Sequence, residues 1–174
     1  KKSYLEETDC KKILESFISI PLSKSRVVQN NKNIVHKDRS SNSSYLDCNH
    51  KLLSPLVEGI SKLIDIPFEN CEPIHFIKYA KGEEYKAHYD ALINTEGCQR
   101  LYTAIVYLNS CSGGNTVFNK LKISVTPETG KLLVFENCFQ GTNHINPGSI
   151  HSSEPVLSGQ KNILTMIFRN SPYQ

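Results

Sequence analysis

EPIHFIKYAKGEEYKAHYD, residues 72–90, decides the fold that we expect for this chain of 174 residues. Its two halves, 74–79 and 84–90, are rich in β-branched and aromatic residues and flank a turn at Gly82, which is typical of two neighbouring strands. Similar short runs bounded by glycine continue toward the C-terminus; they are residues 101–109, 116–118, 121–125, 131–135 and 162–168. The region after Pro67 therefore predicts at least seven strands with no helix between them.

Two stretches in the N-terminal third have helical spacing of their apolar residues. The first, residues 10–18, follows Thr8 and Asp9, either of which can act as its N-cap. The second, residues 54–64, begins with Ser54 as a candidate N-cap followed directly by proline, a residue favoured in the first turn. Both stretches are therefore expected to form helices that precede the strands.

Residues 27–44 are rich in Asn, Ser and Lys, which predicts a mobile surface loop. Helices first and strands afterwards argue against a parallel doubly wound sheet. We expect an α+β fold that is mainly β, an antiparallel sandwich or barrel with the N-terminal helices packed on one side. The length, and the lack of internal repeats or composition breaks, predict a single domain over residues 1–174.

Composition excludes several classes of protein. A hydrophobic fraction of 39% and a charged fraction of 21% exclude a disordered chain, and the longest apolar runs are too short to span a membrane. Twenty basic and 17 acidic residues leave a net charge of +3, which argues against a nucleic-acid partner. The six cysteines are scattered without a C-x-x-C pair, so free thiols are expected, which favours the cytoplasm over the lumen of the endoplasmic reticulum. A disulfide-linked extracellular sandwich without metal is the alternative.

The expected strand at 84–90 ends in His88-Tyr89-Asp90. Residues two apart on a strand point to the same face, so the imidazole and the carboxylate can converge on one ion. Nitrogen and carboxylate ligands suit a first-row divalent metal, and one further histidine would complete the two-histidine, one-carboxylate triad of non-haem Fe(II) oxygenases. His144 and His151 are the histidines that follow Asp90, and the spacing alone does not choose between them.

Lys161 stands at the start of the most apolar strand, 162–168. If alternate residues of this strand face the interior, its ammonium group points into a largely apolar pocket. A buried lysine needs an anionic partner, which a dicarboxylate co-substrate would supply. A lysine at the strand mouth, in contact with water, is the other interpretation.

The quoted run resembles the central segment of the prolyl 4-hydroxylases of the 2-oxoglutarate/Fe(II) dioxygenase class, E-x6-Y-x2-G-x2-Y-x2-H-x-D. Further elements follow in the family order, and together they span about residues 39–169. They are Arg39-Ser40-Ser41, Gln99-Arg100, Thr103, Tyr107-Leu108-Asn109, Gly113-Gly114-Asn115-Thr116-Val117-Phe118, Gly130-Lys131-Leu132-Leu133-Val134-Phe135, His151-Ser152-Ser153-Glu154-Pro155-Val156 and Gly159-Gln160-Lys161. The chain departs from the family at Asn115, Asn162 and Ile167, where the family commonly has glutamate, tryptophan and tryptophan.

This resemblance implies a double-stranded β-helix (jelly-roll) core. It implies iron ligands at His88, Asp90 and His151, and so selects His151 over His144. Lys161, Tyr79 and Thr103 would bind the 2-oxoglutarate co-substrate, with Lys161 and Tyr79 at its distal carboxylate. The positions that would contact a peptide are Arg39, Ser41, Glu72, Tyr85 and Arg100.

The resemblance further implies a peptidyl-prolyl 4-hydroxylase similar to procollagen-proline 4-dioxygenase. It would use Fe(II), 2-oxoglutarate, O2 and ascorbate, and would release succinate and CO2. Its expected partner is a proline-containing peptide or protein, with no nucleic acid and no membrane. The alternatives are an oxygenase of the same fold that acts on another residue or a modified nucleobase, and a jelly-roll binding module without turnover.

Overall fold

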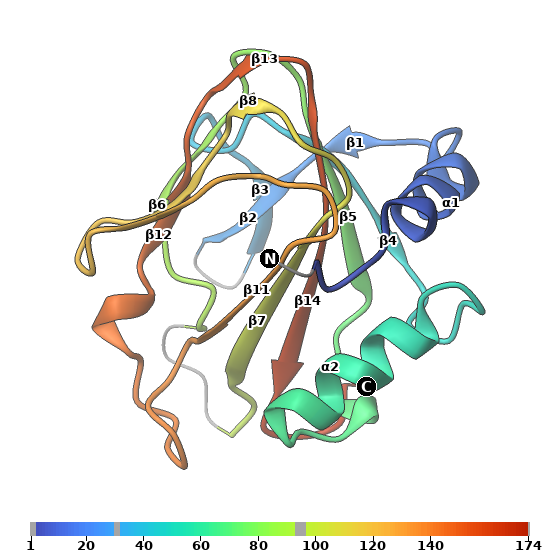
Figure 1. Cartoon of the computed structure of the whole chain (residues 1–174). Coiled ribbons are helices and arrows are strands. Elements are labelled where there is room, and N and C mark those ends of the chain that lie inside the picture. Colours follow the sequence, from blue (N-terminus) through green and yellow to red (C-terminus); the bar gives the residue numbers. More distant parts are fainter. Residues whose placement is uncertain (1–2, 30–31, 93–96, 174) are drawn as a thin grey trace.

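The computed structural model describes residues 3–29, 32–92 and 97–173. Its larger sheet is antiparallel and contains six strands (Figure 1). In spatial order these strands are β1 (Ser23–Lys24), β4 (Asn42–Leu46), β5 (Ile74–Tyr79), β14 (Lys161–Arg169), β7 (Arg100–Tyr107) and β11 (Leu132–Glu136). The C-terminal strand β14 thus lies at the centre of the sheet, between β5 and β7.

A smaller antiparallel sheet faces the larger one, on the left in Figure 1. Its order is β10 (Ile123–Val125), β9 (Thr116–Phe118), β12 (His151–Ser153) and β6 (Tyr85–His88). Two further strand pairs complete the β structure: β8 (Ser112–Gly113) with β13 (Val156–Ser158), and β2 (Arg26–Gln29) with β3 (Lys32–Val35). Short 3-10 helices occupy Phe68–Asn70 and Pro147–Ser149.

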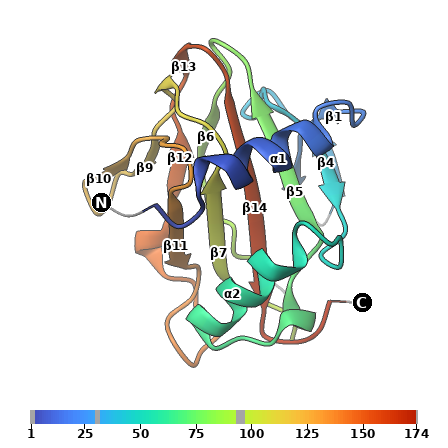
Figure 2. The same cartoon turned by 45° about the vertical axis from the view of Figure 1, so that its right-hand side comes forward.

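Helices α1 (Glu7–Phe17) and α2 (Ser54–Ile64) both cover the outer face of the larger sheet (Figure 2). Their buried apolar residues join those of β4, β5, β7 and β14 in one hydrophobic cluster. Leu164, Met166 and Phe168 of β14 are fully buried there, and each such side chain contributes about 1.5–3 kcal/mol of burial free energy. The expectation of an antiparallel β body with helices on one side is therefore confirmed.

The other face of β14 points toward the smaller sheet. Because side chains alternate along a strand, every second residue of β14 lines a cavity between the two sheets. These residues are Lys161, Ile163, Thr165, Ile167 and Arg169. This alternation carries Lys161 into the interior, as the pattern of the terminal strand predicted.

Both helices differ from the sequence-based expectation at their N-termini. α1 begins at Glu7, so Thr8 and Asp9 lie in its first turn, and no side chain caps it. α2 has Leu53 rather than Ser54 at the N-cap, again without a side-chain cap. Backbone hydrogen bonds from Leu53 and Ser54 to the carbonyl of His50 already form a turn before α2, which moves the start of the helix by one residue.

The expectation of a mobile loop over residues 27–44 is wrong for the described part of that segment. It contains β2, β3 and the beginning of β4, and β4 pairs with both β1 and β5. Polar residues can enter the sheet here because their hydroxyls satisfy one another: Ser41 Oγ donates to Ser25 Oγ at 2.9 Å, and Ser25 Oγ donates to Ser43 Oγ at 2.8 Å. Burial of polar groups costs little free energy when they are hydrogen-bonded. The polar composition of this segment therefore did not predict that it forms strands.

Two expectations about the chain as a whole can be compared with the structure. All six cysteines lie in the described residues and are free thiols, as expected. None of the helices in the parts of the chain that the structure describes is long and apolar enough to cross a bilayer.

Candidate active site

Two histidines and one carboxylate meet where β6 and β12 pair. His88 is the last residue of β6, His151 is the first residue of β12, and the two are direct partners in the antiparallel ladder. Asp90 lies two residues beyond His88 and outside the strand, which corrects the expectation that the whole H-x-D motif is in a strand. The backbone bends at Asp90 and Ala91, and the Asp90 carboxylate lies near both imidazoles. Pairing of distant strands therefore brings His151 to the H-x-D motif.

The three side chains form a compact set of ligand atoms. One ligand atom from each of His88, Asp90 and His151 lies within 4.8 Å of the other two. His88 Nε2 is 3.5 Å from Asp90 Oδ1, and His151 Nε2 is 3.8 Å from Asp90 Oδ2. His144, the alternative third histidine, is exposed and does not belong to this group.

Backbone carbonyls orient both imidazole rings. His88 Nδ1 lies 2.8 Å from the carbonyl oxygen of Lys86, and His151 Nδ1 lies 2.9 Å from that of Ser149. A carbonyl can only accept, so each Nδ1 carries the proton and each Nε2 presents its lone pair. This arrangement, a metal-facing nitrogen with the other nitrogen bonded to a carbonyl, is the usual one for histidine ligands.

The protonation states suit metal binding as well. Burial lowers the pKa of His151 to about 4, so its imidazole is neutral near pH 7. Burial raises the pKa of Asp90, but nearby His151 and His88 outweigh it and hold this pKa below its usual range. A neutral imidazole and an ionised carboxylate are the forms that coordinate a divalent cation.

A hydrogen-bonded chain behind the site fixes the Asp90 carboxylate. Thr103 Oγ1 donates to Asp90 Oδ2 at 2.8 Å, and Asn137 Nδ2 donates to Thr103 Oγ1 at 2.8 Å. Thr103 and Asn137 are both fully buried. The Thr103 hydroxyl is bonded to Asp90, and the predicted contact of Thr103 with the co-substrate stays a prediction.

Replacing Thr103 with valine is expected to weaken metal binding about 10- to 100-fold, the usual effect of losing a hydrogen bond to a ligand. The shape of the side chain is kept, but the Asp90 carboxylate loses its donor and Asn137 its acceptor. Titration of the purified protein with Co(II) or Fe(II) without oxygen measures the change. Thr103→Ser, which keeps the hydroxyl, should bind metal like the wild type. Equal affinities of all three proteins would show that Thr103 does not act through Asp90.

Lys161 lies deep in the same cavity, with 1% of its surface exposed. Its Nζ donates to the carbonyl of Gly114 at 2.6 Å and to Ser153 Oγ at 2.7 Å. Among the described residues it has no carboxylate partner within ion-pair distance. Burial lowers its pKa to about 8, although Cys111 and Glu154 raise it in part. A buried ammonium without an anion is costly, so this site favours an incoming carboxylate.

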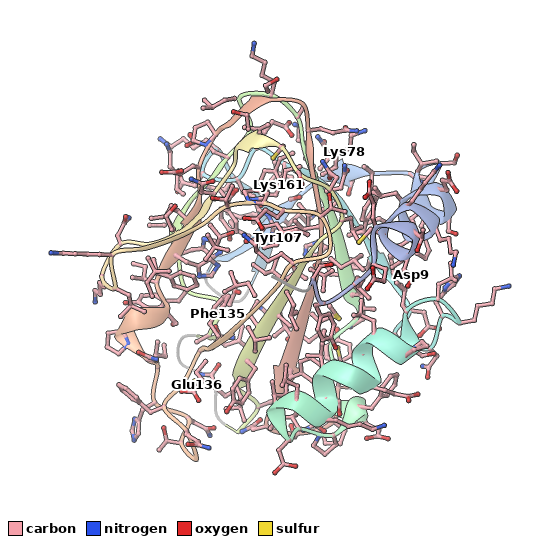
Figure 3. The ribbon with its side chains drawn as sticks, in the orientation of Figure 1. Asp9, Lys78, Tyr107, Phe135, Glu136 and Lys161 are labelled. Carbon is pink, nitrogen blue, oxygen red and sulfur yellow. The ribbon has the colours of Figure 1, made fainter. Side chains whose placement is uncertain are left out.

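Aromatic rings and a glycine shape the space around this ammonium. Lys161 Nζ is 4.8 Å from the ring centre of Tyr79 and 6.0 Å from that of Tyr107, and Figure 3 shows Lys161 and Tyr107 together in the interior. Gly114, at φ +66°, allows its carbonyl to approach: a Cβ there would lie 3.1 Å from Val156 and 3.2 Å from the lysine stem. The family resemblance implied that Tyr79 and Lys161 act together, and the structure places the two side chains in contact.

The cavity has a volume of about 1150 Å³ and contains both the triad and Lys161. Of the predicted peptide contacts, Arg39, Glu72, Tyr85 and Arg100 line it, whereas Ser41 is fully buried and donates to Ser25 Oγ. The Arg39 guanidinium lies over the Tyr85 ring at 4.7 Å, and that ring stacks on His88 at 3.6 Å. The buried Nε of Arg39 has no hydrogen-bond partner among the described residues.

Glu72 and Arg100 contact each other rather than standing free. Arg100 Nε and Nη2 both donate to the Glu72 carboxylate at 2.7 Å, and Arg169 Nε donates to it at 2.6 Å. Arg100 Nη1 also donates to the Asp90 carbonyl at 3.3 Å. The pair therefore braces the metal-binding turn from one side; a contact of either residue with a peptide stays a prediction.

Sequence reasoning missed three residues that the structure places in these networks: Ser153, Asn137 and Arg169. Arg169 could have been found, because it continues the inward alternation of Lys161 along β14. Ser153 is likewise two residues from His151 on the same strand. Asn137 gives no such signal, because it follows the end of β11 and its role depends on a turn.

Two imidazole nitrogens and one carboxylate oxygen on one side of an open cavity match the donor set of a non-haem Fe(II) centre. Lys161 lines the same cavity as these three ligands, and its ammonium is available to a carboxylate that enters it. The fold and site thus define a metal-dependent oxygenase of the jelly-roll type. The chain belongs to the 2OG-Fe(II) oxygenase superfamily, whose sequence pattern matches residues 74–169.

Individual proteins support this assignment. The "Putative prolyl 4-hydroxylase" of Acanthamoeba polyphaga mimivirus is 30% identical over 180 residues, which cover 97% of this chain and 72% of that protein. Prolyl 4-hydroxylase 2 of Arabidopsis thaliana is 28% identical over 192 residues, 92% of this chain and 62% of that protein. The chain thus spans between 62% and 72% of these two relatives.

Solved structures confirm the jelly-roll fold. The viral collagen prolyl hydroxylase of Paramecium Bursaria Chlorella virus-1, in its 2OG complex, aligns with a TM-score of 0.82 at 22% identity, over 98% of this chain and 94% of that one. A Trichoplax adhaerens prolyl hydroxylase in complex with a peptide fragment of hypoxia inducible factor aligns with a TM-score of 0.71 at 18% identity, over 97% and 81%.

Proposed function

We propose that this chain is an Fe(II)- and 2-oxoglutarate-dependent prolyl 4-hydroxylase that acts on proline in a peptide or protein. The observation that carries the proposal is the buried Lys161 ammonium, which faces the same cavity as His88, Asp90 and His151 and has no anionic partner among the described residues. The names of the similar proteins supply the prolyl substrate, and one of them was solved with a peptide.

In this proposal each group of residues has a separate task. His88, Asp90 and His151 hold Fe(II), which supplies the oxidative chemistry that couples O2 and 2-oxoglutarate to hydroxylation, with release of succinate and CO2. Lys161 and Tyr79 bind the distal carboxylate of the co-substrate and so fix its orientation. The rings of Phe118 and Phe135 lie 5.5 and 4.8 Å from that of His151 and limit the access of water from this side.

The affinity for 2-oxoglutarate is expected to fall as the pH rises above about 8, because the pKa of Lys161 lies there. Below this pH the lysine is charged and can pair with the distal carboxylate; above it, binding requires uptake of a proton. The apparent KM for 2-oxoglutarate should then rise about tenfold per pH unit. 2-Oxobutyrate, which lacks the distal carboxylate, provides the control and should show no such slope. A KM for 2-oxoglutarate that stays flat between pH 7 and 10 would contradict the role of Lys161.

Mass spectrometry of a peptide library tests the substrate. Peptides with one or several prolines are incubated with the protein, Fe(II), ascorbate and 2-oxoglutarate, and a gain of one oxygen atom on proline is the expected result. Ascorbate belongs to the proposal as a reductant that keeps the iron ferrous. Oxygen on a residue other than proline, or succinate formation that no peptide stimulates, would contradict the prolyl assignment while leaving the oxygenase assignment intact.

A further inference from the structure

Two cysteine side chains lie side by side at the N-terminal end of β5. Cys48 follows β4, Cys71 precedes β5 by three residues, and the two are only 8% and 5% exposed. Both thiols donate to the same acceptor, the carbonyl oxygen of Glu72, at 3.2 Å from Cys48 and 3.3 Å from Cys71. The two sulfur atoms thus flank one oxygen atom, and they also interact with each other. We call these residues the Cys48–Cys71 pair.

Strand pairing brings the two cysteines together. β4 and β5 are antiparallel, and the ladder between them ends with Leu46 opposite Ile74. The same register, continued by two positions, puts Glu72 opposite Cys48 and Cys71 one position further along. Residues so placed are ~6 Å apart between Cα atoms, which is within the range of ~4.4–6.8 Å that disulfides span. A bond between the two sulfur atoms therefore needs little movement of the backbone.

The two thiols differ in acidity. Hydrogen bonding by the Cys71 thiol lowers the pKa of Cys48, although burial opposes this. The same interaction, together with burial, raises the pKa of Cys71. Because the thiolate is the reactive form of cysteine, an oxidant reacts first with Cys48. The exposed 8% of Cys48 is enough for contact with a small uncharged oxidant.

We propose that the Cys48–Cys71 pair is a site of reversible disulfide formation, with hydrogen peroxide as the oxidant. The Cys48 thiolate attacks one peroxide oxygen and the O–O bond breaks, which leaves a sulfenic acid on Cys48 and a hydroxide that takes up the proton Cys48 had lost. The Cys71 sulfur then attacks the Cys48 sulfur, and the new S–S bond displaces hydroxide, which leaves as water with the Cys71 proton. The two thiols together lose two electrons and two protons, and one peroxide becomes two water molecules.

The disulfide joins the two ends of the segment that carries α2. Residues 49–70 lie between the two cysteines and contain both α2 and the 3-10 helix Phe68–Asn70. Closing a loop of this length lowers the entropy of the unfolded chain and so favours the folded state. Cys71 is also directly followed by Glu72, whose carboxylate holds Arg100 beside the metal-binding turn. Oxidation therefore tethers the outer helix and the residue that braces the candidate site.

Peroxide treatment followed by alkylation tests the site in the wild-type protein. After hydrogen peroxide, iodoacetamide and a non-reducing tryptic digest, we expect one pair of peptides linked through Cys48 and Cys71, lighter than the separate peptides by two hydrogen atoms. Dithiothreitol should restore both thiols. Cys98→Ser is the matched control: it removes a less buried thiol, which is bonded to Arg169 and Ser171, and should give the same link. Alkylation of both Cys48 and Cys71 after the treatment would overturn the proposal.

Two serine variants test the order of the steps. Cys71→Ser keeps a donor beside Cys48 but cannot form the disulfide, so the sulfenic acid on Cys48 should accumulate and be captured by dimedone. Cys48→Ser should yield no dimedone adduct on Cys71, whose thiol is the less acidic of the two. Equal adducts on the remaining cysteine of both variants would contradict the assignment of Cys48 as the residue that peroxide attacks.

Urea unfolding measures the effect on stability. The midpoint of the oxidised wild type should lie about 1–2 M above that of the reduced protein, and dithiothreitol should reverse the shift. Peroxide should leave the midpoint of Cys71→Ser unchanged, because no loop is closed. A linked wild type with the midpoint of the reduced protein would contradict the stabilising role. These measurements need no metal, co-substrate or peptide, so their outcome is independent of the proposed function.

Discussion

His151→Ala is expected to abolish both hydroxylation and the succinate formation that occurs without peptide. The structure pairs His151 directly with His88 and points both Nε2 atoms toward Asp90, so removal of one imidazole leaves two ligands. Structural and catalytic sites of this kind need at least three protein ligands to retain a metal. We expect the affinity for Fe(II) to fall at least about 100-fold, measured by anaerobic titration.

His144→Ala is the matched control for this experiment. His144 is the other histidine that follows Asp90 in the sequence, and it is exposed and outside the cluster. Its replacement should leave metal affinity and turnover unchanged. Normal turnover in His151→Ala, or loss of turnover in His144→Ala, would mean that the ligand set is wrong.

Lys161→Met should have opposite effects on co-substrate binding and on stability. Loss of a buried charge partner is expected to raise the KM for 2-oxoglutarate at least about 100-fold. In the absence of co-substrate, however, the variant no longer buries an unpaired ammonium, and methionine fills a similar volume. Its free energy of unfolding should therefore exceed that of the wild type by about 1–2 kcal/mol.

Denaturant unfolding with and without 2-oxoglutarate measures the second effect. The wild type, in the presence of Mn(II), should gain stability on addition of 2-oxoglutarate, because a ligand of the native state shifts the unfolding equilibrium. Lys161→Met should gain little at the same concentration. A variant that is less stable than the wild type and still responds to 2-oxoglutarate would contradict the assignment of Lys161 as the carboxylate partner.

The sequence predicts most of the fold after Pro67, because the strands there are short, apolar and bounded by turns. The expected strand at 74–79 matches β5, and that at 116–118 matches β9. The segment 27–44 is different: the hydroxyls of Ser41 and Ser43 are hydrogen-bonded to Ser25, outside the segment, and no local pattern reveals this. Neither helix has a side-chain cap, and α2 starts one residue away from the expectation because a turn at His50–Ser54 precedes it.

The candidate site divides in the same way. The H-x-D spacing singles out His88 and Asp90, although Asp90 lies outside the strand, and strand alternation places Lys161 in the interior. The choice of His151 depended on the family resemblance, since its pairing with His88 is a contact between distant segments. The roles of Thr103, Glu72 and Arg100 depend on hydrogen bonds to residues that are between 10 and 97 positions away in the sequence, which sequence spacing does not encode. For Thr103, Glu72 and Arg100, the structure identifies the hydrogen-bond partners that the sequence motifs do not specify.

A crystal structure of the protein with Mn(II) and 2-oxoglutarate, obtained without oxygen, is the most direct test of the site. We expect one metal ion ~2.0–2.3 Å from His88 Nε2, His151 Nε2 and an Asp90 carboxylate oxygen. The distal carboxylate of the oxo acid should lie within hydrogen-bond distance of Lys161 Nζ and the Tyr79 hydroxyl. A metal bound elsewhere, or an oxo acid whose distal carboxylate points away from Lys161, would contradict the account.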